Sequence, residues 1–152
     1  MNTTDRNKHA VIVRSGESEA LSVTGAEVRL LCEGELTGQA WSVSECTAPE
    51  NSGPPPHQHP WDEGYYILEG EIRFILGDQQ TVARRGDFVY VPANTVHAFQ
   101  GASARPARML FFDAPAHAGS FFREVASEVK DFPRDAYKMG EIGERHGIHF
   151  IH

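Results

Sequence analysis

Short apolar runs separated by turn residues make up most of the chain between about residue 19 and residue 115. The runs are rich in Val, Ile, Phe and Tyr, and the breaks between them contain Gly, Pro, Asn and Asp, a combination typical of β-strands and their turns. Many short strands at regular spacing favour a sandwich or barrel of antiparallel strands. The pattern predicts strands at residues 27–32, 39–47, 63–68, 71–76, 80–83, 88–91, 97–100 and 107–113.

Two of these predicted strands contain runs that are apolar on both faces, "YYIL" at Tyr65–Leu68 and "FVYV" at Phe88–Val91. A strand of this kind needs cover on both sides. We therefore expect a second layer or a partner subunit over the outer side, and this apolar outer face favours a homodimer.

The two ends of the chain follow other patterns. The first residues are polar apart from the short run "AVIV" at residues 10–13, and we expect them to be partly flexible. Near the other end, apolar residues at helical spacing predict a helix over residues 117–129, and a weaker helix is expected over 134–146 because it contains Gly140 and Gly143. The expected organisation is an N-terminal segment at 1–18, a β-barrel domain at 19–115 and a helical C-terminal tail at 116–152 that packs on the barrel.

Composition narrows the functional classes. With 152 residues the chain is long enough for one domain with a real core, and its formal charge of −7 argues against nucleic acid or an anionic membrane as a partner. No apolar run reaches the roughly 18 residues of a membrane span, and the N-terminus lacks a secretory signal, so we expect a cytoplasmic location. Cys32 and Cys46 are expected to be small hydrophobic residues rather than a disulfide.

Three histidines and one acid form the main candidate for chemistry. In an extended segment, residues two apart point to the same face, so His57 and His59 project together, and Glu63 follows as the chain re-enters a strand. His97 begins a later strand. A His-x-His pair alone is usually an ordinary surface feature. If the two segments are neighbours across a barrel, however, three imidazoles and one carboxylate can meet.

Such a ligand set suits one divalent transition metal. Imidazole and carboxylate together are compatible with Fe, Mn, Ni, Cu, Co or Zn. Four protein ligands in a five- or six-coordinate site leave one or two positions for water, substrate or dioxygen. The site would then be catalytic or ligand-binding rather than purely structural.

The spacing of these residues resembles the two motifs of the cupin superfamily. The first, G-x5-H-x-H-x3,4-E-x6-G, is matched in register by the two histidines, Glu63 and Gly70. The second, G-x5-P-x-G-x2-H-x3-N, is matched by Gly86, Pro92 and His97. The chain departs from the motifs at Asn51 and Asn94, which stand where the family has Gly, and at Gly101, which stands where it has Asn. Asn readily adopts left-handed backbone conformations, so Asn94 is compatible with its turn.

The resemblance implies an all-β fold, a jelly-roll β-barrel with short C-terminal α-helices, and it implies His57, His59, Glu63 and His97 as metal ligands. The wording of the motifs looks most like the quercetin dioxygenase-like branch of single-domain cupins. This likeness implies a dioxygenase that uses a divalent metal and O2 on an enolizable or flavonol-like small molecule, with Glu63 both as ligand and as catalytic base. A homodimer is the usual state by the same likeness.

Two other functions stay open because a fold does not determine a reaction. One is a metal-dependent isomerase or lyase acting on a sugar or keto acid, for which a pocket rich in Lys and Arg would be expected. The motif region offers only Arg73, Arg84 and Arg85. The other is a non-catalytic protein that binds a small molecule or a metal.

The two-residue alternation of side chains along a strand predicts which residues form the wall of a substrate pocket. Tyr65 and Ile67 share the parity of Glu63, and Phe99 shares that of His97, so all three would face the cavity. Membership of the barrel core explains them equally well.

Two further candidates for the pocket wall, Trp41 and Val43, lie on one face of the 39–47 strand. Glu45 lies on the same face and is expected to be solvated. In the tail, His146, His149 and His152 lack metal-ligand spacing and are expected to be incidental.

Overall fold

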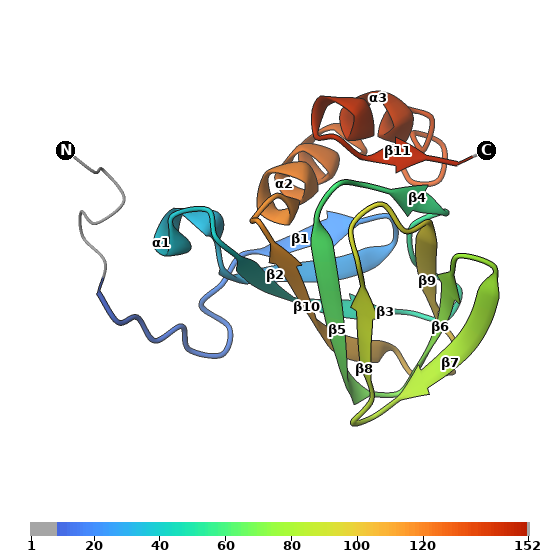
Figure 1. The fold of residues 1–152 in the computed structure, drawn as a ribbon, viewed down its shortest axis with the longest axis horizontal. Coiled ribbons are helices and arrows are strands. Elements are labelled where there is room, and N and C mark those ends of the chain that lie inside the picture. The colour runs from blue at the N-terminus through green and yellow to red at the C-terminus, as the bar shows by residue number, and fades with distance from the viewer. Residues whose placement is uncertain (1–8, 152) are drawn as a thin grey trace.

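The computed structural model describes residues 9–151, and within this range the chain folds into two antiparallel β-sheets that face each other, with helices at one end (Figure 1). The six-stranded sheet has the order β1-β2-β3-β10-β5-β8, and the five-stranded sheet has the order β11-β4-β9-β6-β7. This confirms the predicted all-β jelly-roll barrel with short helices. The elements are β1 Ala20–Val23, β2 Ala26–Cys32, α1 Gly34–Thr37, β3 Ser42–Ala48, β4 His57–Gln58, β5 Asp62–Glu69, β6 Glu71–Leu76, β7 Gln79–Arg84, β8 Phe88–Val91, β9 His97–Gly101, β10 Ala107–Ala114, α2 Ala118–Glu128, α3 Lys138–Arg145 and β11 His149–Phe150.

All eight strands predicted from the apolar runs are present, most of them displaced by a residue or two at an end. The largest shift is in β3, which begins at Ser42 and not at Gln39, because Gly34–Thr37 forms a short helix that ends at Gly38 in the left-handed conformation. Three strands were not expected. β1 lies just before the first strand that the apolar runs predicted, and β4 and β11 have two residues each, which is too short for any periodic signal.

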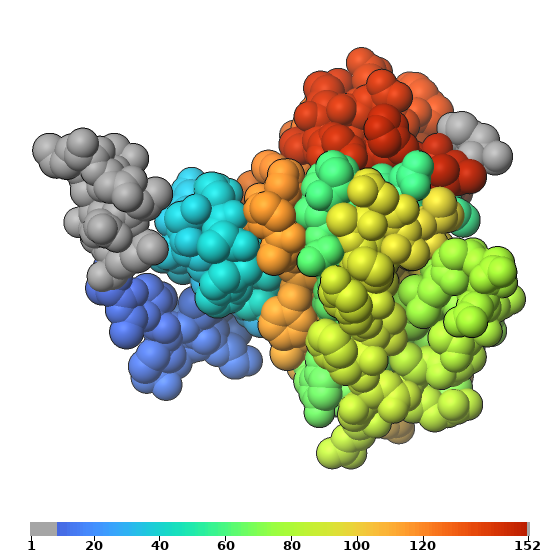
Figure 2. All heavy atoms as spheres, in the orientation of Figure 1, coloured from blue at the N-terminus to red at the C-terminus, as the bar shows by residue number. Residues whose placement is uncertain are grey.

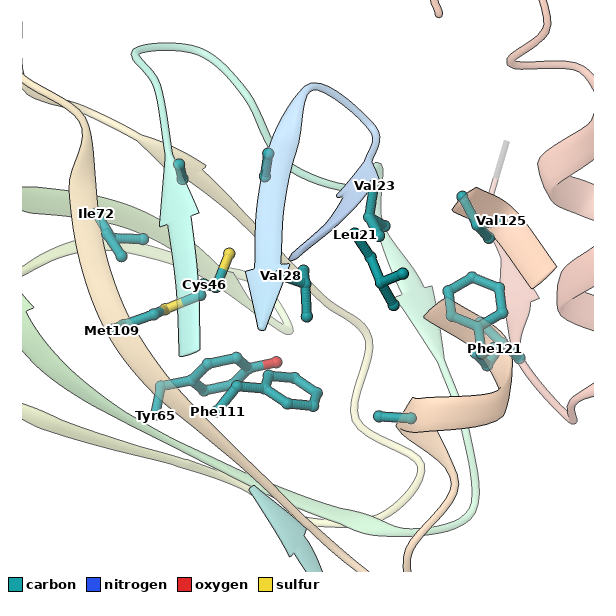
Figure 3. Close-up of a cluster of buried hydrophobic side chains, with 14 of the residues drawn as sticks. Leu21, Val23, Val28, Cys46, Tyr65, Ile72, Met109, Phe111, Phe121 and Val125 are labelled. Carbon is teal, nitrogen blue, oxygen red and sulfur yellow. The ribbon is translucent and has the colours of Figure 1, made fainter. Parts of the chain in front are cut away.

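Strands from both sheets contribute to the barrel core. Tyr65 on β5 and Met109 and Phe111 on β10 point inward, and Ile72 extends the core from the other sheet (Figure 3). Cys46 on β3 is buried in the same core, and neither Cys46 nor Cys32 forms a disulfide.

The C-terminal tail packs on one end of the barrel. Phe121 and Val125 of α2 lie against Leu21 and Val23 of β1 (Figure 3), so the helix buries the face that its apolar spacing predicted. In Figure 2 the tail forms one continuous surface with the strands beneath it. After α3 the chain turns at Gly147 and adds β11 to β4, with Phe150 opposite His57.

Asp113 connects the barrel to this tail. The side chain is buried at the end of β10, where Oδ2 accepts hydrogen bonds from the backbone N–H groups of His117 and Ala118, each at 2.7 Å. Oδ1 accepts the hydroxyl of Ser42. Because the first N–H groups of a helix have no partner within the helix, this carboxylate stabilises the start of α2 and sets its direction.

The run at residues 10–13 forms no strand, and Val11, Ile12 and Val13 are exposed. No helix among residues 9–151 is long and apolar enough to cross a membrane.

Candidate metal centre

The fold brings the four predicted ligand residues together between the two sheets. His57 on β4 and His97 on β9 are register partners in one sheet, and Glu63 belongs to β5 of the other. His59 lies in the short turn between β4 and β5. All four side chains are buried, and one ligand atom from each lies within 4.8 Å of the others. In the part of the chain that the structure describes, this is the one group of three or more His, Cys, Asp or Glu residues with such spacing.

The three imidazole rings are oriented by the same kind of hydrogen bond. In each, Nδ1 faces a backbone carbonyl two residues away: Pro55 O for His57 at 2.9 Å, Trp61 O for His59 at 3.2 Å and Thr95 O for His97 at 2.7 Å. A carbonyl only accepts hydrogen bonds, so Nδ1 must carry the proton in every ring. The lone pair of each neutral imidazole is then on Nε2, the atom available to a metal.

Both carboxylate oxygens of Glu63 face these Nε2 atoms. Oε1 lies 2.8 Å from Nε2 of His59, and Oε2 lies 2.9 Å from Nε2 of His97. Oε2 also accepts a hydrogen bond from the Tyr65 hydroxyl. Among the described residues, His59 Nε2 has no partner with hydrogen-bond geometry despite its closeness to Oε1. A lone pair and a carboxylate oxygen at this distance repel each other unless a cation or a proton lies between them.

Burial and mutual contact set the charges of the group. Burial, assisted by the neighbouring His97, lowers the pKa of His57 to about 4, so this ring is neutral near pH 7. Burial would raise the pKa of the Glu63 carboxyl, but its contacts with His59 and His97 outweigh this and hold the pKa well below its usual range. Burial also opposes protonation of His97, yet the hydrogen bond to Glu63 prevails and raises its pKa. A proton on Nε2 of His97 would therefore turn its contact with Oε2 of Glu63 into a hydrogen bond.

A divalent cation placed between the imidazole Nε2 atoms and the Glu63 carboxylate would remove the repulsion at all of these contacts together. Two ligand atoms on opposite sides of a zinc ion are separated by about 4 Å, since each bond is close to 2 Å. The observed spread of 4.8 Å needs little adjustment to reach that range. Three imidazole nitrogens and one carboxylate suit transition metals rather than calcium or magnesium, which prefer oxygen ligands. The residues therefore fit the implied metal.

The departures from the cupin motifs keep the geometry of the turns. Asn51 and Asn94 replace glycines, and both adopt the left-handed conformation, with φ of 66° and 65°. The backbone N–H of Asn94 donates to the carbonyl of His59 at 2.8 Å, so this turn holds the ligand loop directly. At Gly101, a β-carbon would lie 2.3 Å from the carbonyl oxygen of Pro49, which leaves no space for the family's Asn.

A narrow cavity is lined by three of the four predicted ligands, His57, His59 and Glu63. Its volume is about 60 Å³, which is room for about five water-sized groups. Apart from the site residues, its wall is almost wholly apolar, and no Lys or Arg of residues 9–151 lines it. The barrel contributes Val28, Ser44, Cys46, Tyr65, Phe99 and Phe111, and the tail closes the space with Ala118, Phe121, Phe122, Met139, Ile148 and Phe150.

Of the five predicted pocket residues, Tyr65 and Phe99 line this cavity. Ile67 has the same parity as Tyr65 but lies further along β5, in the fully buried barrel core. Trp41 and Val43 do not line the cavity.

On β3 the alternation is the reverse of the predicted one. The small residues Ser42, Ser44 and Cys46 face inward, whereas Val43 and Glu45 face the outer side, where Glu45 pairs with Arg108. Trp41 is 47% exposed. An inward row of small side chains leaves space for the cavity, and this is why the larger apolar residues on this strand do not point to the centre.

Sequence reasoning missed the tail as part of the site. Phe150 is on the strand that pairs with β4, and its ring lies 5.7 Å from that of His57. The apolar residues Ile148, Phe150 and Ile151 were the available signal, but they are interspersed with histidines and form no regular pattern. Of these histidines, His146 contacts Glu124 and not the metal site, His149 is exposed on β11, and His152 lies outside the described residues.

Comparison with known proteins agrees with this geometry. Residues 44–113 match the cupin domain family. Quercetin 2,3-dioxygenase of Bacillus subtilis is 31% identical over 91 residues, which are 59% of this chain but only 27% of that protein.

Solved structures show the same fold. A predicted oxalate decarboxylase from Thermotoga maritima has a TM-score of 0.64 at 23% identity, over 69% of this chain and 99% of that one. The polyketide cyclase RemF from Streptomyces resistomycificus has a TM-score of 0.62 at 20% identity, over 70% and 80%. Likeness at this level of identity extends to the fold alone. Residues 44–113 thus match a cupin domain in sequence, and the two motifs and the jelly-roll architecture agree with that match.

Proposed function

We propose that this protein is a metal-dependent dioxygenase that acts with O2 on an enolizable or flavonol-like small molecule. The observation that carries the proposal is the convergence of three imidazole Nε2 atoms and the Glu63 carboxylate beside an apolar cavity. The sequence likeness to a quercetin 2,3-dioxygenase supports the choice of reaction. The chemistry that a bound divalent metal supplies at such a site is Lewis acidity toward a substrate oxygen and reactivity toward O2.

Glu63 is the proposed base. Its carboxylate is charged and buried, and an acidic hydroxyl of the substrate placed beside it would transfer its proton to one of the two oxygens. Tyr65 donates to Oε2, so this oxygen is already occupied by one hydrogen bond. Burial, together with the charge of Glu63, raises the pKa of Tyr65 far above its usual value, which keeps the phenol protonated. Oε1 is then the oxygen with more capacity to accept a proton.

The apolar wall and the small volume of the cavity both restrict how a substrate could bind. Its apolar side chains would hold a planar or aromatic body and exclude water from the site. A flavonol is larger than a space of about 60 Å³, so the tail that closes the cavity must move aside to admit one.

An isomerase or lyase acting on a charged sugar or keto acid is less well supported, because the cavity has no Lys or Arg in its described lining. A non-catalytic binding protein would use the same site. Oxygen consumption by metal-loaded protein in the presence of quercetin and related enolizable compounds separates these cases. The expected result is substrate-dependent oxygen uptake that disappears in Glu63→Gln. Uptake at background level across the panel, with the metal fully loaded, would overturn the dioxygenase proposal.

We also propose a homodimer formed through the outer face of the six-stranded sheet. Trp41, Tyr66, Phe88 and Tyr90 are exposed there, and β8 lies at the edge of the sheet. A cluster of exposed aromatic residues of this kind marks an interaction surface. A second copy of this chain would cover the aromatic surface, since a two-fold axis brings the same patch of both subunits together.

A further inference from the structure

Trp61 has a hydrogen-bond donor that none of residues 9–151 uses. The side chain is 2% exposed, and its Nε1 has no hydrogen-bond partner among the described residues. Native proteins pair almost all buried N–H groups, because an unpaired donor loses its hydration without compensation. The same indole lines the cavity beside the metal ligands. An unpaired donor in the wall of a candidate binding cavity suggests that its partner is a ligand.

Two histidines fix the orientation of the indole. The ring of His59 stacks on it with centroids 4.1 Å apart and planes within 10°, and the ring of His117 stacks on it at 4.2 Å and 4°. Two imidazoles at these separations cannot share one side of a single indole, so they cover opposite faces. The edge of the indole, which carries Nε1, is therefore the part of the ring that the two imidazoles leave uncovered.

The cavity offers this donor almost no acceptor from the protein. The carboxylate oxygens of Glu63 already face His59, His97 and the Tyr65 hydroxyl. The remaining polar side chains in the wall are the hydroxyls of Thr24 and Ser44. A water molecule is held well only where it finds two to four polar partners, and this apolar wall supplies few. Such a water would be displaced readily by a better acceptor.

The chemistry of the wall restricts what that acceptor is. An indole N–H only donates, so it selects an acceptor oxygen and not a second donor. The absence of Lys and Arg from the described lining disfavours an anionic ligand, and the apolar side chains favour a compact hydrocarbon body.

We propose that Trp61 orients a neutral, largely apolar ligand by donating its indole N–H to a carbonyl, ether or hydroxyl oxygen of that ligand. The proposal rests on the proposed role of the cavity as a small-molecule site and adds to it a residue and a ligand class. Trp61 is thus a specificity residue that neither the motifs nor strand parity indicates.

A matched pair of probes tests this in metal-free protein. Cyclopentanone has a carbonyl acceptor, and methylenecyclopentane has almost the same shape without it. Calorimetric titration of the wild type is expected to show about three- to tenfold tighter binding of cyclopentanone, the size of one neutral hydrogen bond. Trp61→Phe keeps an aromatic ring between the two histidines and removes the donor, so this preference should vanish. The smaller ring affects both probes alike, because they have almost the same shape. An equal preference in both proteins, or no binding of either probe to the wild type, would overturn the proposal.

A second measurement leaves residue 61 unchanged. The chain has two tryptophans, so the ¹⁵N-labelled Trp41→Phe protein has a single indole N–H signal. Cyclopentanone should move this signal downfield, as a new hydrogen bond does, and methylenecyclopentane should not; identical shifts with both probes would contradict the assignment. Both experiments lack metal and turnover, so their outcome is distinct from that of the oxygen-uptake test.

Discussion

His57 and Phe150 are register partners on adjacent strands, so a predicted metal ligand and the tail that closes the cavity belong to the same strand pair. The two rings lie 5.7 Å apart. Any displacement of β11 therefore changes both the roof of the cavity and the backbone that carries His57. This coupling means that access to the cavity can be altered from the tail, without changing a residue of the site.

Gly143 is a position in the tail where a substitution should alter access to the cavity. A β-carbon at this position would lie 2.7 Å from the Phe150 ring and 2.9 Å from the carbonyl oxygen of Ile148, so Gly143→Ala must displace β11. We expect a loss of about 1–3 kcal/mol in the free energy of unfolding, the usual cost of overpacking. We also expect faster hydrogen exchange at the β4 and β11 amides and faster extraction of metal by EDTA.

Gly140 is the matched control in the same helix. Apart from its chain neighbours and its own helix backbone, no atom of residues 9–151 lies within 4 Å of a β-carbon built there, so Gly140→Ala should raise the free energy of unfolding by about 0.5–1 kcal/mol through helix propensity alone. Equal rates of metal extraction in the two variants would contradict the view that the tail closes the site.

His59→Ala tests the metal site itself. The purified wild type is expected to contain close to one divalent metal per chain by elemental analysis, whereas the variant should lose most of it. The loss of affinity should exceed the 10–100-fold that is typical of removing an outer-shell partner, because a direct ligand is removed. His149→Gln, on exposed β11, is the control and should keep its metal. Equal metal content in wild type and His59→Ala would refute the assignment of this site.

The pKa of His57 predicts a pH dependence of the metal-free protein. Burial lowers this pKa from 6.5 to about 4. Between these values the unfolded chain binds a proton at His57 and the folded protein does not, so this residue makes stability fall as the pH falls from 6.5 to 4. The raised pKa of His97 acts in the opposite direction, mainly above pH 6.5, so a variant is needed to isolate the effect of His57.

In His57→Gln the contribution of His57 is absent. Urea unfolding in EDTA at pH 7, 5.5 and 4.5 should show a wild-type stability that declines more steeply than that of the variant, by at most about 1.4 kcal/mol per pH unit. Parallel pH profiles for the two proteins would rule out this role.

The sequence was informative where chemistry and pattern coincide. The motif spacing identifies His57, His59, Glu63 and His97, and the fold does bring them together because β4 and β9 are neighbours. The left-handed φ of Asn94 was also foreseeable from the tolerance of Asn for that conformation.

Other features depend on tertiary packing and could not be read from local pattern. Trp41 and Val43 were predicted as part of the pocket wall because they share one face of their strand, but this strand buries the opposite face, with small residues such as Ser44. The two-residue strand β11 has no periodic signal at all. Its position is determined by the helices before it.

The proposed dimer can be tested on its aromatic patch. Phe88→Glu places a charge on the edge strand β8, where Phe88 is 60% exposed, and should convert a dimer to a monomer in light scattering without loss of the fold. Tyr137→Glu makes the same kind of change at another exposed aromatic residue, in the tail, and should leave the dimer intact. A wild type that is already monomeric at micromolar concentration would exclude the dimer.

The hydroxyl of Tyr65 is expected to stabilise the buried charge of Glu63. The fully buried hydroxyl donates to Oε2, and no other hydroxyl of residues 9–151 hydrogen-bonds to that carboxylate. Tyr65→Phe keeps the ring and removes this donor, so the buried charge loses part of its stabilisation. We expect the metal-free protein to lose about 1.5–3 kcal/mol of unfolding free energy, the range for a hydrogen bond to a charged group. Tyr90→Phe removes an exposed hydroxyl and should change stability by less than about 0.5 kcal/mol. If urea unfolding of the two variants in EDTA gave the same free energy, the Tyr65 hydroxyl would not be what stabilises the carboxylate.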